Sequence, residues 1–132
     1  SVIYCIGEDI DTKNKNETYL FLSKQLDILG QLQSISEDKL RSITVAYEPI
    51  WAIGSGMNAE KEYIEDIHAF INKSLKDIFG HDKQDFYFSV VYGGSVKLDN
   101  SKEILSSGNV DGLLIGGASL DPDTFSKIYN LS

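Results

Sequence analysis

The chain has 132 residues, of which 42% are apolar and 24% are charged, and its formal net charge is −8. The first two values are ordinary for one globular domain and exclude a disordered or collagen-like chain. The acidic balance argues against a nucleic-acid partner or an anionic membrane surface, the single cysteine excludes an intrachain disulfide, and no apolar run reaches the roughly 20 residues that span a bilayer.

Four short apolar runs rich in β-branched or aromatic residues predict strands at residues 2–6, 43–47, 86–91 and 110–115. None of them alternates cleanly between apolar and polar side chains, which is typical of strands buried on both faces. Cys5 lies inside the first run, and we expect it to be a small buried hydrophobe. That run begins without a methionine or a basic leader, so we also expect a missing upstream part.

A helical pattern follows each of the first two predicted strands. The polar residues 9–17 are expected to form a loop, after which leucines recur at the spacing of one helix face: Leu22, Leu26 and Leu29. A longer apolar stripe follows the second strand and comprises Ile64, Ile67, Ile71, Leu75 and Ile78. Gly80 stands where such a helix would be capped.

Helices are also predicted after the third and fourth strands. Asp99 is a candidate N-cap for a short helix that runs to about Ser107 and stops at Gly108. The pair Asp121 and Pro122 is typical of an N-cap followed by proline at the first helical position. The apolar face of this last helix would consist of Phe125, Ile128 and Tyr129.

The predicted order is therefore four consecutive βα units, which favours an α/β fold with a parallel sheet covered by helices. Four units in 132 residues give 132/4 = 33 residues per unit. Eight such units would need about 260 residues, near the usual size of a (β/α)₈ barrel. A small doubly wound sheet fits this arithmetic nearly as well.

Glu48 follows the second predicted strand directly, at the end where chemistry takes place in parallel α/β folds. It is a candidate catalytic carboxylate, although a surface cap or a salt-bridge partner is the alternative at such a position. The next residues form an apolar loop that carries Trp51 and Ile53 between a proline and two glycines. Such a loop favours a mobile lid over a loop packed permanently on its own domain.

Two Gly-Gly pairs end the third and fourth predicted strands, at residues 93–94 and 116–117. Glycines let backbone N–H groups approach an anion, and the loops after the last two strands are the usual phosphate site of a barrel. The sequence therefore predicts a phosphate site built from backbone groups. His68 and His81 are expected to be structural, and no residue spacing indicates a metal site or a serine nucleophile.

Four segments of the chain closely resemble the triosephosphate isomerase family. They occur in the family's order and spacing: CIGE at residues 5–8, AYEPIWAIGSG at 46–56, YGGSV at 92–96 and DGLLIGGASL at 111–120. The resemblance implies that residues 1–132 are the C-terminal half of a TIM barrel, with strands 5 to 8 in four parallel βα units. It also implies a barrel enzyme that uses no cofactor and no metal.

The resemblance assigns roles to individual residues. Glu48 matches the catalytic base, and residues 49–59 match the lid with its hinges. Backbone groups would bind the substrate phosphate at Gly54, Ser95, Gly116 and Gly117. Glu8 and Trp51 match a pair that holds the lid, and Tyr92 matches a tyrosine whose hydroxyl meets the closed lid near Ala59.

The resemblance implies that the parent protein is a cytoplasmic homodimer that interconverts dihydroxyacetone phosphate and glyceraldehyde 3-phosphate in glycolysis and gluconeogenesis. The family's catalytic Asn, Lys and His belong to segments that this sequence lacks, so we expect the chain to be inactive without the N-terminal half-barrel. Two alternatives remain open. One is a different barrel enzyme with the same phosphate loops, and the other is a non-catalytic half-barrel module that binds phosphate.

Overall fold

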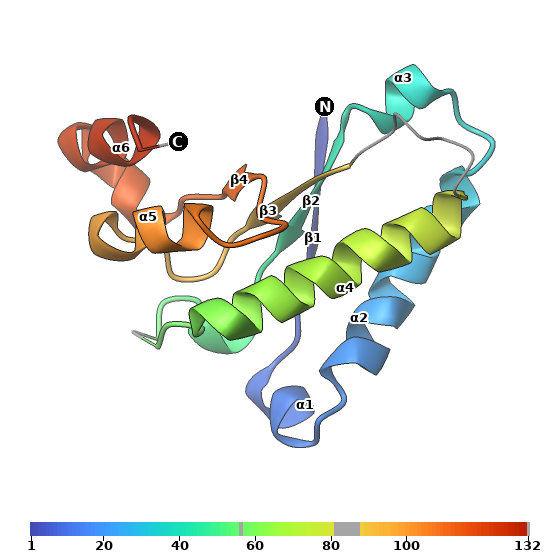
Figure 1. The fold of residues 1–132 in the computed structure, drawn as a ribbon, viewed down its shortest axis with the longest axis horizontal. Coiled ribbons are helices and arrows are strands. Elements are labelled where there is room, and N and C mark those ends of the chain that lie inside the picture. Colours follow the sequence, from blue (N-terminus) through green and yellow to red (C-terminus); the bar gives the residue numbers. More distant parts are fainter. Residues whose placement is uncertain (56, 81–87, 132) are drawn as a thin grey trace.

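The fold is one parallel sheet with helices between its strands (Figure 1). The structure is a computed structural model, and it describes residues 1–55, 57–80 and 88–131. The four strands lie in sequence order, namely β1 (Val2–Ile6), β2 (Ile43–Tyr47), β3 (Ser89–Tyr92) and β4 (Gly112–Leu113). The predicted succession of four βα units is confirmed, and the arrangement is consistent with part of a (β/α)₈ barrel.

Helical segments follow every strand. They are α1 (Ile10–Asn14), α2 (Thr18–Leu26), the 3₁₀ turn η1 (Asp27–Leu32), α3 (Glu37–Leu40), the 3₁₀ turn η2 (Ile50–Ala52), α4 (Lys61–Phe79), α5 (Leu98–Leu105), the 3₁₀ turn η3 (Gly117–Leu120) and α6 (Pro122–Tyr129). In Figure 1, α6 lies against α5 beyond the β4 end of the sheet.

The strands differ in how many of their residues pair with a neighbouring strand. β1 and β2 pair along five residues, from Val2 opposite Ile43 to Ile6 opposite Tyr47. β4 pairs only through two residues with β3, so the strand predicted at 110–115 is too long. A strand's length depends on its neighbours, and β4 has one neighbour in the described part of the chain. The strand predicted at 86–91 lies partly outside the described residues, which resume at Phe88. Within them, β3 begins at Ser89.

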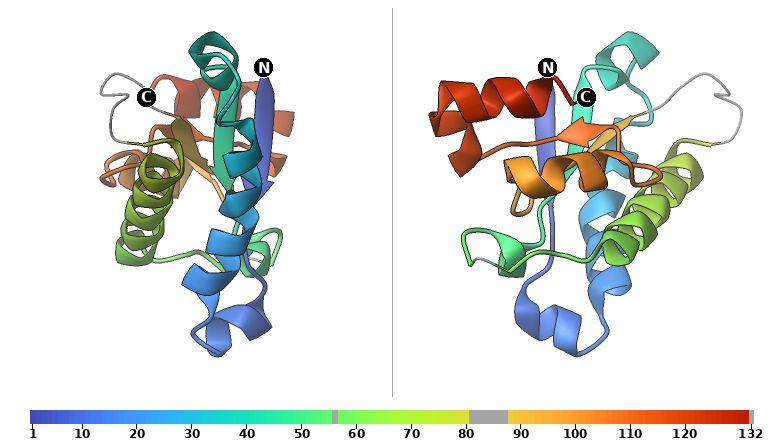
Figure 2. Two further views of the ribbon diagram at one scale, coloured as in Figure 1. Left: turned by 90° about the vertical axis from the view of Figure 1, so that its right-hand side faces the viewer. Right: turned by 60° about the vertical axis from the view of Figure 1, so that its left-hand side comes forward.

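The hydrophobic core lies between the sheet and two helices that run side by side, α2 and α4 (Figure 2). The leucine pattern and the long isoleucine stripe supply it as predicted, except that Ile78 is only partly buried. Its fully buried members on the helices are Leu22, Leu26, Ile64, Ile67 and Ile71. Burying an aliphatic side chain of this size contributes about 1.5–3 kcal/mol.

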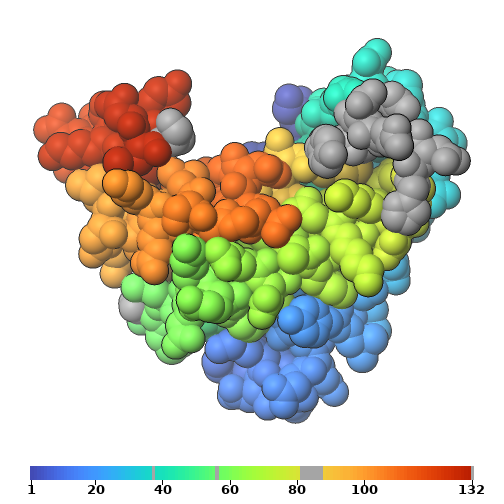
Figure 3. All heavy atoms as spheres, in the orientation of Figure 1, coloured from blue at the N-terminus to red at the C-terminus, as the bar shows by residue number. Residues whose placement is uncertain are grey.

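The opposite face of the sheet is open at β1. Ile3 is 53% exposed and Cys5, two residues further along the same face, is exposed as well, so the expectation that this strand is buried on both faces is wrong. Tyr4, in contrast, points to the helix layer and donates a hydrogen bond from its hydroxyl to the Gln25 carbonyl. The space-filling view in Figure 3 shows the covered side of the molecule, where α4 and α5 form the near surface. Within the described residues, helices cover one face of the β1 end of the sheet and not the other.

Helix ends follow the predicted caps in two of four cases. The Asp121 carboxylate accepts hydrogen bonds at the start of α6, and Gly80 ends α4 with a φ of 85°, a conformation that favours glycine. Residues 9–17 are not a simple loop, because the Asp9 carboxylate caps α1 by accepting from the Thr12 N–H at 2.8 Å.

The predicted start of the α5 helix is also displaced. Its N-cap is Lys97 rather than Asp99, because the Asn100 side chain accepts a 2.7 Å hydrogen bond from the Lys97 N–H. The helix ends at Leu105, two residues before the predicted end, and the chain turns through Asn109, which has a φ of 67°.

Candidate active site

Glu48 stands at the carboxyl end of β2, in a position that two glycines make possible. Its N–H extends the β1–β2 ladder by donating to the Ile6 carbonyl at 2.7 Å. A β-carbon at Gly7 would lie 1.8 Å from the Glu48 carbonyl oxygen, and one at Gly93 would lie 2.6 Å from the Glu48 Cγ. Both glycines are therefore required by close approach, one to the backbone of Glu48 and the other to its side chain.

Cys5 is a neighbour of this carboxylate, which the sequence did not lead us to expect. The prediction that it is buried is wrong, since Cys5 points to the open face of the sheet and is exposed. A hydrogen bond to Glu48 raises the pKa of the Cys5 thiol to about 11, with burial and the negative charge of Glu48 as smaller causes. The thiol therefore stays protonated near neutral pH, as a weak donor to the carboxylate.

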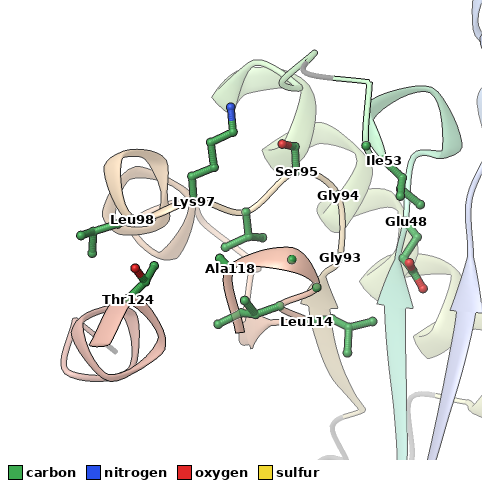
Figure 4. Close-up of a pocket in the computed structure, with 15 residues that line it drawn as sticks. Glu48, Ile53, Gly93, Gly94, Ser95, Lys97, Leu98, Leu114, Ala118 and Thr124 are labelled. Carbon is green, nitrogen blue, oxygen red and sulfur yellow. The ribbon is translucent and has the colours of Figure 1, made fainter. Parts of the chain in front are cut away.

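One pocket of about 680 Å³ brings all five predicted site residues together (Figure 4). These residues are Glu48, Gly54, Ser95, Gly116 and Gly117. They come from the ends of β2, β3 and β4, three segments that are far apart in sequence. Figure 4 shows Glu48 on one side of the pocket, Thr124 on the far side and Ser95 between them. The catalytic and phosphate-binding roles of these residues stay predictions.

The two Gly-Gly pairs differ in what surrounds them. A β-carbon at Gly94 would lie 2.2 Å from the Tyr92 hydroxyl, so the first pair is tightly packed. Gly116 and Gly117 have no atom within 4 Å of a β-carbon position, so their backbone faces open space beside the pocket. That space lets a ligand approach the main chain closely. Sequence reasoning missed Lys97, an exposed side chain that lines the same pocket.

The loop after Glu48 is anchored to a buried carboxylate. Glu8 is fully buried and accepts a 2.9 Å hydrogen bond from the Trp51 indole Nε1, the pair that the resemblance implied. The hydroxyl of Tyr47 donates to the same carboxylate at 3.1 Å, and that of Tyr63 donates at 2.8 Å. Three donors thus satisfy a buried charge, which would otherwise be very costly.

Two contacts of this anchor have no signal in the sequence. Tyr63 reaches Glu8 from the first turn of α4, 55 positions along the chain. The Lys13 ammonium lies 4.0 Å from the centroid of the Trp51 ring, within the range of a cation–π contact. The spacing of these residues follows no local rule, so only the folded chain identifies them.

The far end of the loop meets Tyr92. Burial raises the pKa of the Tyr92 hydroxyl to about 12, and a backbone hydrogen bond from Ala59 acts in the opposite direction. This contact between Tyr92 and Ala59 is the one that the resemblance implied. Ile53, in the middle of the loop, is 46% exposed and lines the pocket together with Leu114.

The remaining candidates give no further site. His68 is completely buried in α4, and His81 lies outside the described residues. Among the residues that the structure describes, no group of three His, Cys, Asp or Glu side chains could hold a metal ion. The helices in the same described ranges include none that is both long and apolar enough to cross a bilayer.

Comparisons with known proteins agree with the geometry. The family model described as triosephosphate isomerase matches residues 1–132. A triosephosphate isomerase of Thermodesulfovibrio yellowstonii is 44% identical over 127 residues, which are 96% of this chain and 49% of that protein. The triosephosphate isomerase of Chlamydia felis is 43% identical over 96% of this chain and 48% of its own length. That of Francisella tularensis subsp. mediasiatica is 41% identical over 97% of this chain and 49% of its own length. The chain spans about half the length of the curated relatives it matches.

Proposed function

This chain belongs to the triosephosphate isomerase family, and on that premise we propose that the complete protein interconverts dihydroxyacetone phosphate and D-glyceraldehyde 3-phosphate. The observation that carries the proposal is the single pocket that holds Glu48 and four glycine or serine residues from three strand ends. A carboxylate beside a phosphate cradle is what an isomerase that moves a proton between neighbouring carbons needs.

Glu48 acts as the base in this proposal. Its carboxylate takes a proton from one carbon of the bound substrate, an enediol forms, and the same group returns the proton to the adjacent carbon. No metal or organic cofactor takes part. The Cys5 thiol, a hydrogen-bond donor to Glu48, and the Gly93 backbone beside the Glu48 side chain restrict the orientations of the carboxylate. Orientation of this kind accounts for a large part of enzymatic rate enhancement.

The substrate phosphate is held by backbone groups in the same proposal. Gly54, Ser95, Gly116 and Gly117 offer N–H donors at the pocket wall, and such donors bind an anion without a basic residue. The chain has a net charge of −8, so a phosphate site made of main-chain dipoles keeps the local field favourable in an acidic protein. Closure of residues 49–59 over the pocket would exclude water.

We also propose that the site is completed by residues outside this sequence. The family's Asn, Lys and His belong to an N-terminal half-barrel, which would pair with the open sheet edges along β1 and β4. The exposed Ile3 and Cys5 on the open face of β1 support this partner, because a barrel interior is filled from all sides. The complete protein would act as a cytoplasmic homodimer in glycolysis and gluconeogenesis.

The test is an isomerase assay on the complete enzyme with the variant Glu48→Gln. We expect kcat to fall by about 10²- to 10⁴-fold, the contribution of a general base, with a much smaller effect on substrate binding. Glu103→Gln, which changes an exposed carboxylate on α5, is the matched control and should leave kcat unchanged. A kcat for Glu48→Gln within about tenfold of wild type, or about 1.4 kcal/mol, would contradict the role of base.

A second assay separates an enzyme half from a phosphate-binding module. The chain alone should be inactive, and addition of the N-terminal half should restore turnover. Phosphate binding without turnover in the reassembled protein would instead favour a non-catalytic half-barrel module.

A further inference from the structure

His68 packs against two tyrosines of the sheet, Tyr47 and Tyr92, whose own ring centroids lie 6.3 Å apart. Its side chain is completely buried, and its ring centroid lies 5.9 Å from that of Tyr47 and 6.3 Å from that of Tyr92. The first contact is edge-to-face at 84°, and the second is tilted at 44°. Aromatic pairs at these separations prefer defined relative orientations, so the imidazole restricts both phenol rings.

Each of these tyrosines is connected to one end of the 49–59 loop. The Tyr47 hydroxyl donates to both oxygens of Glu8 at 3.1 Å, and Glu8 holds the Trp51 indole at 2.9 Å. The Tyr92 hydroxyl meets the backbone of Ala59 at the other end. The two ends of the loop are thus attached to two phenols that share one neighbour.

The imidazole is itself held in one orientation. Its Nδ1 lies 3.1 Å from the Asn109 carbonyl oxygen, which fixes Nδ1 as the protonated nitrogen of a neutral ring. Its Nε2 is the one buried side-chain nitrogen or oxygen in the described residues that has no hydrogen-bond partner. Leaving a buried acceptor unsatisfied costs about 1–3 kcal/mol.

We propose that His68 is a positioning residue that holds Tyr47 and Tyr92 in a fixed relation, so that both ends of the 49–59 loop close together over the pocket. The proposal rests on the isomerase function proposed above. The hydrogen bond from Nδ1 orients the ring, and the ring faces orient the tyrosines. Loss of the ring leaves the two phenols with their mutual contact alone, beside an empty space into which each can turn, so the two ends of the loop are held less firmly relative to each other.

The experiment uses the complete enzyme and three substitutions. His68→Ala removes the ring and the hydrogen bond, and His68→Phe keeps a ring of similar size while it removes the hydrogen bond. Asn72→Ala is the matched control, because the Asn72 amide donates to the same Asn109 carbonyl at 3.3 Å from a partly exposed position, one turn further along α4. All three should be studied well below their melting temperatures.

Loop closure is measured by fluorine NMR of fluorotryptophan at Trp51, assigned by loss of its resonance in Trp51→Phe. The probe ligand is glycerol 3-phosphate, which carries the phosphate and cannot be isomerised. We expect saturating ligand to shift the resonance to one sharp line in wild type and in Asn72→Ala. In His68→Ala the line should stay broadened or divided between two positions, and kcat/KM should fall by at least about tenfold. His68→Phe keeps a ring in contact with both tyrosines and should recover most of both signals.

Two outcomes overturn the positioning role. One is a His68→Ala enzyme that melts earlier but shows the wild-type bound resonance and kcat/KM. The other is a His68→Phe enzyme whose bound resonance is as broad as that of Glu8→Gln, a variant that lacks the loop anchor. This second outcome can be observed even if His68→Ala fails to fold. If the complete wild-type enzyme lacks isomerase turnover, the proposed function fails, and the NMR comparison still tests the positioning role because it needs no catalysis.

Discussion

The Cγ of Glu48 lies where a β-carbon on Gly93 would come within 2.6 Å of it. A contact this short forces the side chain of Glu48 to move, because the backbone of Gly93 is fixed by its 2.8 Å hydrogen bond to the Tyr47 carbonyl. The end of β3 thus determines where the carboxylate at the end of β2 can lie. A residue with no side chain is in this way part of the geometry that we propose for catalysis.

Gly93→Ala should therefore lower kcat without unfolding the protein. A displacement of the base by about 1 Å can cost about 10²-fold in rate, and we expect a loss of this size in the complete enzyme. Gly108→Ala is the control, because no atom lies within 4 Å of a β-carbon there. Steady-state kinetics of the two variants at one temperature provide the comparison. Equal kcat values for both would show that Glu48 tolerates the added methyl group.

Trp51→Phe should weaken the anchor of the loop on Glu8. It removes one of the three donors to a buried carboxylate, and a lost hydrogen bond to such a charge costs about 1–3 kcal/mol. Tyr63→Phe removes another donor to the same carboxylate, from α4 rather than from the loop. Both variants should lower the free energy of unfolding in denaturant titrations, whereas kcat/KM should fall clearly only in Trp51→Phe. Similar kinetic losses in both variants would mean that Glu8 acts on the fold and not on the loop.

Gly117→Val should abolish phosphate binding and preserve the fold. The open space beside Gly117 is the space that we assign to the anion, and a branched side chain would occupy it. Titration of the complete enzyme with inorganic phosphate, followed by amide chemical shifts, measures the affinity. Gly108→Val adds the same side chain at another open position and should bind phosphate like wild type. Retained phosphate affinity in Gly117→Val would move the anion site elsewhere.

Stability should decrease on acidification because of His68. Burial lowers the pKa of the imidazole from 6.5 to about 4, with the Asn109 carbonyl and Asp111 acting weakly in the opposite direction. Between these two pKa values the unfolded chain binds a proton at His68 that the folded chain does not. The free energy of unfolding is therefore unaffected by this group above about pH 6.5 and decreases as the pH falls toward 4. We expect a loss of about 2 kcal/mol in the free energy of unfolding between about pH 7 and 5.

Denaturant titrations of wild type and His68→Phe at the two pH values measure this effect. The variant has no imidazole at this position, so its free energy of unfolding should change less over the same interval. A pH dependence as steep in His68→Phe as in wild type would assign the effect to other groups.

Local chemistry predicted the parts of the fold that depend on neighbours in sequence. The isoleucine stripe predicted α4, Gly80 predicted its end, and Asp121 with Pro122 predicted the start of α6. These signals are readable because helix caps and helical periodicity act within one or two turns. The cap of α1 was missed because Asp9 stands in a run of polar residues where every position looks like a loop.

Long-range contacts decided the features that could not be predicted. Cys5 stands in an apolar run that is typical of a buried strand, but its exposure depends on what covers the face of the sheet opposite α2 and α4. The predicted site residues lie in one pocket because they stand at strand ends or in the loops that follow them, and parallel strands bring their carboxyl ends together. The Tyr63 hydroxyl and the Glu8 carboxylate are 55 positions apart, and His68 is about 20 positions from the tyrosines that it contacts. No periodic pattern in the sequence predicts contacts at these separations.

Strand order in this sheet equals strand order in the sequence. Each contact between strands therefore closes after one βα unit, and within the described chain no later unit inserts between two earlier ones. Such a topology has a modest contact order for a sheet protein, so a growing polypeptide can add its units one after another as the ribosome releases them. It also means that a break in the chain between two neighbouring units of this sheet interrupts a single strand pairing.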